Sequence, residues 1–403
     1  MSLSAASTEV IRATLPAVGA AIGDITPLFY KKMFAAHPEL ERDLFNRGNQ
    51  KQGDQQRALA GSIAAFAMLQ VSDDAPSTDL IMSRIANKHA SLGITEDQYQ
   101  IVHTYLFEAI VEVLGAAVTP EVAAAWDELY WLMANTLIAM ERDLYADAGV
   151  EPGQVWREVK VTRRVLESPE TVSFVLGSAD GTPLPSYRPG QYISVGVTLP
   201  DGARQIRQYS LVGSPTAADW QISVKAIPGD GTDSPAGEVS NFLYQNVFEG
   251  DTLSVTTPFG DLVLDEGDAP LLLVSAGIGC TPMIGMLNHL ADTAAARPVA
   301  VLHADRSPAR HAHRAELAEL VGQIPSATMH RWYEDLGQRA QDERTFAGRA
   351  DLSGIEIIDG TQVYLCGPMP FMQSVRASLL ERQVPESAIH YEVFGPDSWT
   401  PAN

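Results

Sequence analysis

The sequence predicts a multidomain α + β + α/β protein: an all-α part, then an antiparallel β-barrel, then an α/β part with a parallel sheet. Three changes of pattern support this prediction. Apolar residues recur at helical spacing up to residue 147, alternate with a period of two from residue 153, and form short strands between helical stretches from residue 270. Because 403 residues allow two or three domains, we expect domains at 1–147, 153–265 and 269–403.

The all-α part has recognisable helix boundaries. His37-Pro38 and Gly93 interrupt the helical spacing, and the segments 95–98 (TEDQ) and 119–122 (TPEV) each begin with a threonine that can cap a helix. The segment 149–153, which contains two glycines and a proline, follows as a linker.

Strands are expected in both later parts. In the barrel, apolar residues alternate at 156–161, 172–176, 192–196 and 222–224, between turns rich in glycine, proline and aspartate. In the α/β part, the apolar runs 271–275, 299–303 and 363–366 alternate with helical stretches, which is typical of βαβ units.

Composition excludes several classes of function. Lys and Arg number 28 against 50 Asp and Glu, a net charge of −22, and no basic stripe is present, so binding to nucleic acid and stable anchoring to anionic lipid are disfavoured. The two cysteines, Cys280 and Cys366, fit neither a disulfide framework nor a metal-binding spacing. The N-terminus lacks a signal-peptide pattern, and glycines and a proline interrupt the most apolar stretch, 270–287. We therefore expect a soluble cytoplasmic protein, and the acidic composition favours a monomer.

His89 is a candidate metal ligand because of its sequence context. Alone, a histidine in a helix is more often a surface or core residue than a ligand. Upstream of it, however, lie Tyr30, Phe45 and a pair, Gln55 and Leu59, that shares a helix face at i, i+4. This order resembles the bacterial globins, which carry a Tyr on the second helix, a His-Pro corner, a Phe on the porphyrin, a distal Gln and a proximal His.

The globin resemblance implies a haem b site. It makes His89 the iron ligand and Phe45 the ring that stacks on the haem. Tyr30, Gln55 and Leu59 would line the distal pocket, where a hydroxyl and an amide can donate hydrogen bonds to dioxygen. Phe45 and Leu59 would, however, be core residues in any helical bundle.

Three further residues belong to the same comparison. In the bacterial globins with this pattern, residues matching Tyr99 and Glu141 hydrogen-bond the proximal imidazole, and a carboxylate there raises the basicity of the ligand. Without that context both would be read as surface residues. Lys88 could meet a haem propionate or FAD, although a solvated lysine is an equally good interpretation.

Two motifs in the barrel resemble the flavin-binding domain of ferredoxin reductase-like proteins. They are PGQY at 189–192 and RQYSL at 207–211. An arginine suits a diphosphate because its planar fork donates two charge-assisted hydrogen bonds. The resemblance assigns FAD binding to Arg207, Gln208, Tyr209 and Ser210, with Tyr192 nearby.

The α/β part carries a phosphate-binding type of loop, GIGCTP at 277–282. Its glycines allow the backbone to approach a pyrophosphate, Thr281 is a candidate helix cap, and proline suits the first helical turn. The third glycine of GxGxxG is absent, but the loop resembles the GxGxTP loop of the reductases. The cofactor-binding residues implied are Gly277, Ile278, Gly279, Cys280, Thr281 and Pro282.

Two later segments complete the resemblance to the reductases. Cys366, Gly367 and Pro368 would lie near the nicotinamide, with a buried structural thiol as the other interpretation of the cysteine. Val393, Phe394, Gly395 and Pro396 match the C-terminal motif, in which the phenylalanine covers the flavin ring. The segment 305–307 (DRS) mixes an acid with a base, so the choice between NADH and NADPH stays open.

Over essentially its whole length the chain resembles the flavohaemoglobins. The resemblance implies nitric oxide dioxygenation, in which two NO, two O2 and one NAD(P)H yield two nitrates, with FAD passing electrons from the nicotinamide to the haem. An NAD(P)H oxidase or a (lipid) hydroperoxide reductase is an alternative, since lipid could enter an apolar distal pocket. A globin that senses O2 or NO is disfavoured, because no output or DNA-binding segment is evident.

Overall fold

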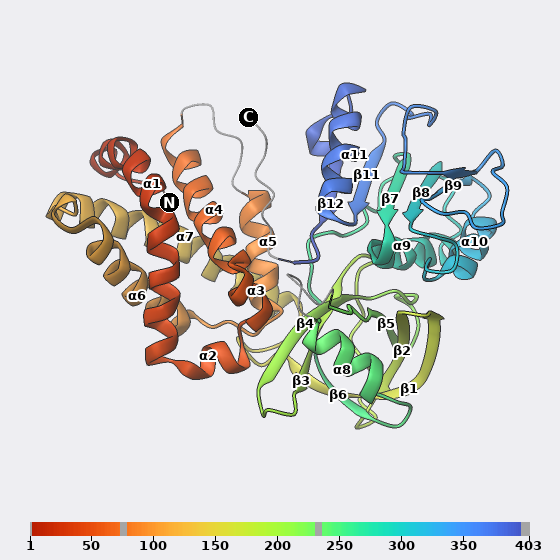
Figure 1. Cartoon of the computed structure of the whole chain (residues 1–403), viewed down its shortest axis with the longest axis horizontal. Coiled ribbons are helices and arrows are strands. Elements are labelled where there is room, and N and C mark those ends of the chain that lie inside the picture. Colours follow the sequence, from red (N-terminus) through yellow and green to blue (C-terminus); the bar gives the residue numbers. More distant parts are fainter. Residues whose placement is uncertain (1, 73–78, 230–235, 396–403) are drawn as a thin grey trace. The chain divides into compact units, whose positions relative to one another are not determined.

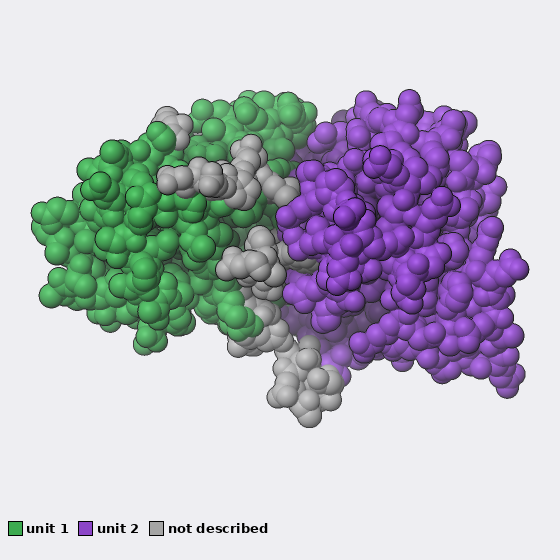
Figure 2. Space-filling model, turned by 90° about the horizontal axis from the view of Figure 1, so that it is seen from above, with its two compact units in different colours: residues 1–156, 196–206, 396–403 green, residues 157–195, 207–395 purple. Residues whose placement is uncertain are grey.

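The computed structural model describes residues 2–72, 79–229 and 236–395 (Figure 1). The chain forms two compact units (Figure 2). The first contains residues 1–156 together with 196–206 and 396–403, and the second contains 157–195 and 207–395. The segment 196–206, although it lies within the predicted barrel, therefore groups with the helices.

The first unit is built from helices. They are α1 (Ala5–Ala36), α2 (Pro38–Asp43), α3 (Arg47–Gln52), α4 (Asp54–Val71), α5 (Asp79–Ala90), α6 (Glu96–Leu114), the 3₁₀ helix η1 (Gly115–Ala117) and α7 (Pro120–Asp147). The expected boundaries are confirmed at His37-Pro38 and at Thr119, whose side chain accepts from the Val122 amide at 3.3 Å. One expectation is wrong: Tyr30 lies on the first helix, because α1 continues through Pro16 and Pro27.

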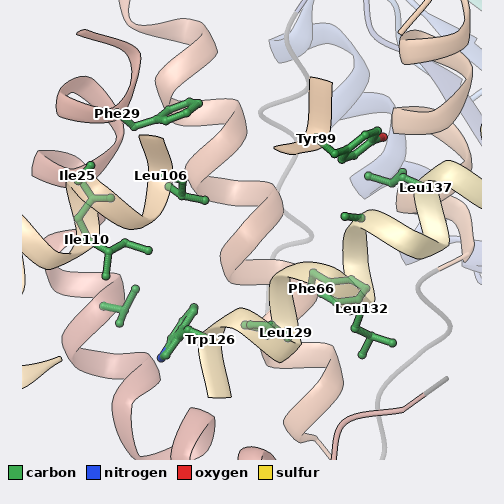
Figure 3. Close-up of a cluster of buried hydrophobic side chains, with 14 of the residues drawn as sticks. Ile25, Phe29, Phe66, Tyr99, Leu106, Ile110, Trp126, Leu129, Leu132 and Leu137 are labelled. Carbon is green, nitrogen blue, oxygen red and sulfur yellow. The ribbon is translucent and has the colours of Figure 1, made fainter. Parts of the chain in front are cut away.

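The core of the first unit lies among α1, α4, α6 and α7 (Figure 3). The figure labels Ile25 and Phe29 from α1, Phe66 from α4, and Leu106, Trp126 and others from α6 and α7. These side chains recur at helical spacing, as expected for amphipathic helices that share one core. The burial of their apolar surface supplies the main stabilisation of the unit.

The six-stranded first sheet corresponds to the predicted barrel. Its strands, in the order β4-β3-β6-β1-β2-β5, are β1 (Trp156–Ser168), β2 (Thr171–Ser178), β3 (Tyr192–Thr198), β4 (Arg204–Ser210), β5 (Trp220–Lys225) and β6 (Thr252–Thr256). The β1–β2 and β2–β5 pairs are antiparallel, as predicted. Helix α8 (Glu238–Asn246) follows β5 along the chain.

The second sheet is parallel, also as predicted. Its order is β10-β9-β8-β7-β11-β12, and the strands are β7 (Leu271–Ala276), β8 (Val299–Asp305), β9 (Ala327–Tyr333), β10 (Thr345–Ala347), β11 (Gln362–Cys366) and β12 (Ile389–Glu392). Its helices are η2 (Gly277–Cys280), α9 (Thr281–Asp292), α10 (Arg314–Gln323), α11 (Met369–Glu381) and η3 (Glu386–Ala388). The order runs outward from β7 to β8 on one side and to β11 on the other. Open α/β sheets bind ligands at such a reversal, outside the carboxyl ends of the strands.

Among the residues that the structure describes, no helix is long and apolar enough to span a membrane. The domain ranges 1–147, 153–265 and 269–403 stay predictions.

Candidate functional site

His89 is the centre of a hydrogen-bonded triad. It lies in the last turn of α5, whereas Tyr99 and Glu141 come from α6 and α7. Its Nδ1 atom is 2.8 Å from Glu141 Oε1 and 2.9 Å from the Tyr99 hydroxyl, and Tyr99 donates to the same Glu141 oxygen at 2.5 Å. Glu141 is 3% exposed, so it depends on these partners for the hydrogen bonds that water would otherwise supply. The structure thus brings together three residues that the sequence analysis selected on separate helices.

The triad determines which nitrogen of His89 is available to a ligand. A carboxylate only accepts hydrogen bonds, so the hydrogen in the short contact with Glu141 belongs to Nδ1. Nε2 therefore carries the lone pair. The side chain of His89 is 33% exposed, so its ring is accessible to a ligand. Metal-ligating histidines typically have this arrangement, with the second nitrogen donating to a carboxylate.

Tyr30 and Gln55 form a second polar pair. Burial raises the pKa of the Tyr30 hydroxyl, although a hydrogen bond with the Gln55 side chain acts in the opposite direction. The Tyr30 ring also makes an edge contact with Phe45, at a centroid distance of 5.9 Å and an angle of 79°. The structure therefore brings Tyr30, Gln55 and Phe45 together. Leu59, one turn after Gln55 in α4, is half-buried against the helical core.

The residues around these two polar groups fit a flat apolar cofactor. Phe45, Leu59, Ile85 and Val102 are apolar but only partly buried. Ile85 lies one turn before His89, and Val102 lies about one turn after Tyr99 in α6, so both flank the triad. An imidazole Nε2 among half-exposed apolar side chains is a donor set that suits haem iron and the faces of a porphyrin.

The flavin-type motifs lie side by side in the structure. The Leu211 amide donates to the Gln191 carbonyl at 2.9 Å, which joins the RQYSL segment to PGQY. Gln208 donates to the Ser194 hydroxyl at 3.0 Å. Arg207 and Tyr209 are half-buried, and Tyr192 and Ser210 are buried. Burial raises the pKa of the Tyr209 hydroxyl, so this group remains a protonated donor.

Helix α9 packs directly on these motifs within the second unit. A Cβ atom on Gly285 would lie 2.5 Å from the Leu211 carbonyl oxygen, and one on Gly190 would lie 2.0 Å from the Leu262 carbonyl oxygen. Asn288, also on α9, donates to the Val212 carbonyl at 2.9 Å. The Gly285 and Asn288 contacts hold α9 against the flavin-type segment, whereas the close approach at Gly190 is to the loop that follows β6; both approaches leave no room for a side chain at the glycine.

The two nicotinamide-type loops meet where the strand order reverses. Gly277 follows β7 and Gly367 follows β11, and these strands are paired, with Ser275 opposite Cys366. A Cβ atom on Gly279 would lie 2.5 Å from the Cys366 carbonyl oxygen, so the loops touch backbone to backbone. Gly277 has a φ of +55°, a conformation that glycine adopts without strain.

The structure corrects the prediction that Thr281 caps α9, and it bears on the role of the two cysteines. Thr281 does not cap α9: the cap position is Cys280, and the Thr281 hydroxyl donates instead to the Ile278 carbonyl at 3.0 Å. The physical reason is that η2 continues directly into α9, so both Cys280 and Thr281 have helical backbone angles and neither has the extended conformation of a typical capping residue. Both cysteines are buried, and burial raises the pKa of each thiol, which disfavours a nucleophilic role.

The C-terminal motif follows β12. Phe394 is 48% exposed, so its ring is accessible to a ligand. Val393 and Gly395 flank it. Pro396 lies outside the described residues.

A globin profile matches residues 28–137, and a profile for oxidoreductase NAD-binding domains matches residues 273–377. The flavohemoprotein of Bordetella pertussis is 42% identical over 405 residues, covering 98% of both chains. The chain belongs to the flavohemoprotein family. The flavohemoprotein of Halalkalibacterium halodurans is 40% identical and covers 98% of this chain.

Solved structures of flavohemoproteins confirm the fold class. The flavohemoglobin of Malassezia yamatoensis, crystallised with bound FAD and heme, superposes with a TM-score of 0.89 at 37% identity, covering 98% of this chain and 100% of that chain. The FAD/NAD-binding domain of a nitric oxide dioxygenase from Vibrio cholerae matches 60% of this chain and all of that chain, at 38% identity and a TM-score of 0.56.

At the end of β8 in this flavohemoprotein, Asp305 and Arg306 differ in burial. Asp305 is 9% exposed, its Oδ1 accepts from the Arg306 amide at 2.6 Å, and its Oδ2 is 3.7 Å from His303 Nε2. The Arg306 side chain is exposed. The acid is therefore buried, while the base is exposed to solvent.

Sequence reasoning missed two residues of the flavohemoprotein site. Ser194 receives the Gln208 hydrogen bond, and nothing in its sequence context marks it. Gly285 permits the contact of α9 with Leu211, and a glycine inside an otherwise apolar helix is a signal that could have identified it.

Proposed function

We propose that this flavohemoprotein converts NO and O2 to nitrate at a haem held by His89, with electrons passed from NAD(P)H through FAD. The observation that carries the proposal is the Glu141 carboxylate on the His89 Nδ1 hydrogen. A carboxylate at this position would increase electron donation by the imidazole to a haem iron, which suits a redox enzyme better than a simple oxygen store.

When bound, haem supplies a redox-active iron, and FAD exchanges the electron pair of a hydride for single electrons. The protein supplies position and hydrogen bonds. Tyr99 and Glu141 hold the His89 ring and its Nδ1 hydrogen. Tyr30, kept protonated by burial, and Gln55 would offer hydrogen-bond donors in the distal pocket, and Leu59 would limit access to them.

In the second unit, Arg207 would bind the flavin diphosphate, while Gln208, Tyr209, Ser210 and Tyr192 would contact FAD. The GIGCTP loop and the N-terminus of α9 would bind the nicotinamide dinucleotide, with Cys366, Gly367 and Pro368 beside its ring. Phe394 would cover the flavin. Lys88 remains a candidate partner of a haem propionate.

Product stoichiometry tests the proposal. Purified protein loaded with haem and FAD, supplied with NO, O2 and NAD(P)H, should form two nitrates for each NAD(P)H oxidised. Tyr30→Phe should lower this rate about 100-fold, the usual cost of removing one preorganised donor. Formation of H2O2 in place of nitrate would favour the oxidase alternative, and loss of an added lipid hydroperoxide would favour the reductase; either result, without nitrate, contradicts the proposal.

We also propose that this chain prefers NADPH. An acid near the adenosine ribose favours the free 2′-hydroxyl of NADH, whereas a base favours the 2′-phosphate of NADPH. Because Asp305 is turned inward and Arg306 is exposed, the base is the group available. Calorimetry should therefore show tighter binding of 2′,5′-ADP than of 5′-AMP, and Arg306→Ala should remove that difference. Equal binding of both ligands by the unmodified protein would contradict this preference.

Finally, we propose a cytoplasmic monomer, supported by the net charge of −22, which opposes self-association, and by the supply of NAD(P)H inside cells. Light scattering should give a mass of 43.5 kDa. Twice that mass would contradict the monomer.

A further inference from the structure

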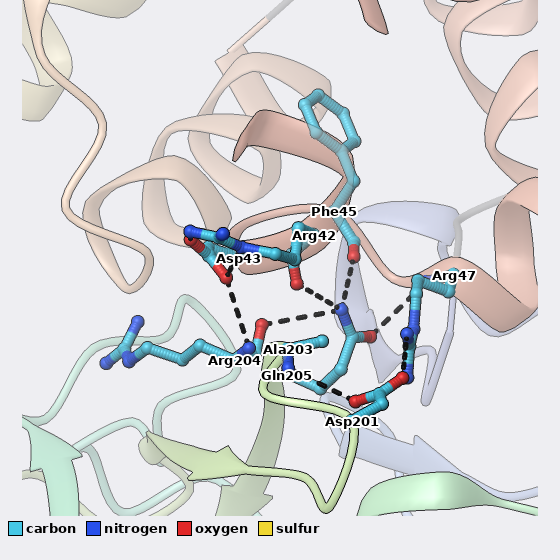
Figure 4. Close-up of polar contacts among 8 residues, drawn as sticks. All are labelled: Arg42, Asp43, Phe45, Arg47, Asp201, Ala203, Arg204 and Gln205. Atoms are coloured by element: carbon cyan, nitrogen blue, oxygen red, sulfur yellow. Dashed lines mark hydrogen bonds and ion pairs between the residues drawn. The ribbon is translucent and has the colours of Figure 1, made fainter. Parts of the chain in front are cut away.

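The tip of the β3–β4 hairpin, residues 196–206, belongs to the helical unit, although strand β4 continues from it into the flavin-type motif at 207–210. Figure 4 shows the polar contacts between this tip and residues 42–47. Within that unit the tip contacts the segment between α2 and α3, which carries Phe45. The residue at the centre of this contact is Gln205, which is fully buried.

Gln205 satisfies backbone groups on both sides of Phe45. Its Nε2 donates to the carbonyls of Arg42 at 3.0 Å and Phe45 at 3.2 Å, and its Oε1 accepts from the Arg47 amide at 3.3 Å. The Arg42 carbonyl lies near the end of α2 and the Arg47 amide begins α3, so both belong to the groups that a helix leaves without internal partners. One amide side chain thus joins the end of one helix to the start of the next.

Two further contacts between the hairpin tip and residues 43–47 lie beside Gln205. The Arg204 amide donates to Asp43 Oδ1 at 3.1 Å, and Arg47 forms an ion pair with Asp201 at 2.6 Å. The Arg204 guanidinium also lies 3.8 Å from the centre of the Trp156 ring. We name the five residues Asp43, Arg47, Asp201, Arg204 and Gln205 the hairpin latch.

We infer that Gln205 is a positioning residue for haem reduction: within the helical unit it joins the hairpin tip and the segment between α2 and α3 into one hydrogen-bonded body, and so holds the haem-stacking residue Phe45 in place. Arg207 follows Gln205 by two residues on the same strand. The inference rests on the proposed assignment of Phe45 to haem and of residues 207–210 to FAD. Its consequence is that disturbing Gln205 loosens the segment that carries Phe45 and slows reduction of the haem, while reduction of the flavin by NAD(P)H is unchanged.

Two measurements on the haem- and FAD-loaded full chain test this inference. In Gln205→Leu, the Arg42 and Phe45 carbonyls and the Arg47 amide lose their hydrogen bonds to this side chain. Hydrogen exchange of the 42–49 segment should then accelerate about tenfold, which corresponds to ~1.4 kcal/mol of local stability. In stopped-flow experiments with NAD(P)H under CO, flavin reduction should be unchanged, while haem reduction should be about tenfold slower.

Control variants distinguish the specific loss of the hairpin latch from a general loss of stability. Gln323→Leu, on the surface of α10, should match the unmodified protein in both measurements. Gln205→Glu keeps the acceptor for the Arg47 amide but places a carboxylate against two carbonyls, so it should also slow haem reduction. If Gln205→Leu does not fold, Asp201→Asn, which removes only the rim ion pair, should give a smaller effect in the same direction.

The outcomes are distinct. Faster exchange of 42–49 with an unchanged rate of haem reduction would overturn the inference, as would unchanged exchange. If the unmodified chain itself does not transfer electrons from NAD(P)H to haem, the proposed function fails instead.

Discussion

Glu141 places a negative charge where the helical core would otherwise be apolar, and the structure gives that charge two hydrogen bonds, from His89 and Tyr99. Burying a carboxylate is costly unless such partners are present. Burial, reinforced by the charge of Glu141, raises the pKa of the Tyr99 hydroxyl, so Tyr99 stays a donor throughout the physiological range. Burying the carboxylate costs free energy, and in return Glu141 orients the His89 ring and raises its basicity.

Replacing Glu141 with glutamine should lower turnover while leaving the fold intact. The amide oxygen of the introduced side chain can still accept from Nδ1, but it carries no charge, so we expect a loss of about 10- to 100-fold in NO consumption, typical for residues that support a metal ligand. The iron–histidine stretching frequency should fall in the resonance Raman spectrum. Glu128→Gln, on the same helix but bonded to Ser4 and Ser7, is the matched control, and equal loss in both variants would contradict the prediction.

His311 predicts an acid sensitivity of the second unit. It is 2% exposed and stacks on His303 at a centroid distance of 3.9 Å. Burial, and secondarily His303, lowers its pKa far below the ordinary value of about 6.5. A proton therefore binds His311 in the unfolded chain but not in the folded one once the pH falls below about 6.5.

The stability that depends on His311 should be complete above pH ~6.5 and should decline by up to about 1.4 kcal/mol per pH unit below it. Urea unfolding of the full chain at pH 7.5 and pH 5.5 measures this change for the transition that exposes the β8–β9 region. In His311→Gln, which cannot titrate, the pH dependence should be weaker. A slope identical to that of the unmodified chain would show that other groups cause it.

At the level of elements, the parallel sheet depends on how closely its loops approach. The loops after β7 and β11 touch through backbone atoms at Gly279, so the crevice at the reversal of strand order has no room for a side chain there. The same is true where α9 meets the flavin-type strands at Gly285. The second unit is thus organised by glycines at element junctions rather than by polar contacts alone.

Gly279→Ala should force the two loops apart. The added methyl group would lie within 2.8 Å of three backbone atoms of Cys366 and Gly367, which cannot move as a side chain would. We expect a loss of about 1–3 kcal/mol in the free energy of unfolding, measured in urea, together with weaker NAD(P)H binding. Gly322→Ala is the control, because no atom lies within 4 Å of the added group and alanine favours the helix. If Gly279→Ala binds NAD(P)H normally, this loop is not the nucleotide site.

On the scale of the whole molecule, the barrel-type sheet and the parallel sheet behave as one unit, while the hairpin tip belongs with the helices. A fragment of residues 153–403 should therefore fold, bind FAD and reduce ferricyanide with NAD(P)H. Its hairpin tip, deprived of Asp43 and Arg47, should be cut by trypsin after Arg204 faster than in the full chain. Equal cleavage rates would show that the helical partners do not protect the tip.

Much of this architecture was predictable because local patterns determine it. Helical spacing, period-two alternation and the glycine loops after apolar strands located the helices and the parallel sheet. Individual side chains of the site were predictable only through their order along the chain, as with Tyr30, Gln55 and His89.

What the sequence could not provide depends on tertiary packing. Gln205 has no motif of its own, because its partners are backbone groups about 160 residues away. The Asp305-Arg306 pair was ambiguous until burial distinguished the two side chains. The helix that carries Tyr30 was misjudged because α1 tolerates two internal prolines.

The burial of both cysteines should protect their thiols from chemical modification. Nitric oxide and oxygen together generate nitrosating species, which modify thiolates that are accessible and ionised. Cys280 and Cys366 are the only cysteines in the sequence, both are fully buried, and burial raises the pKa of each. The protein therefore exposes no reactive thiol to these species, and we expect it to keep its activity when they form, without S-nitrosation of its cysteines.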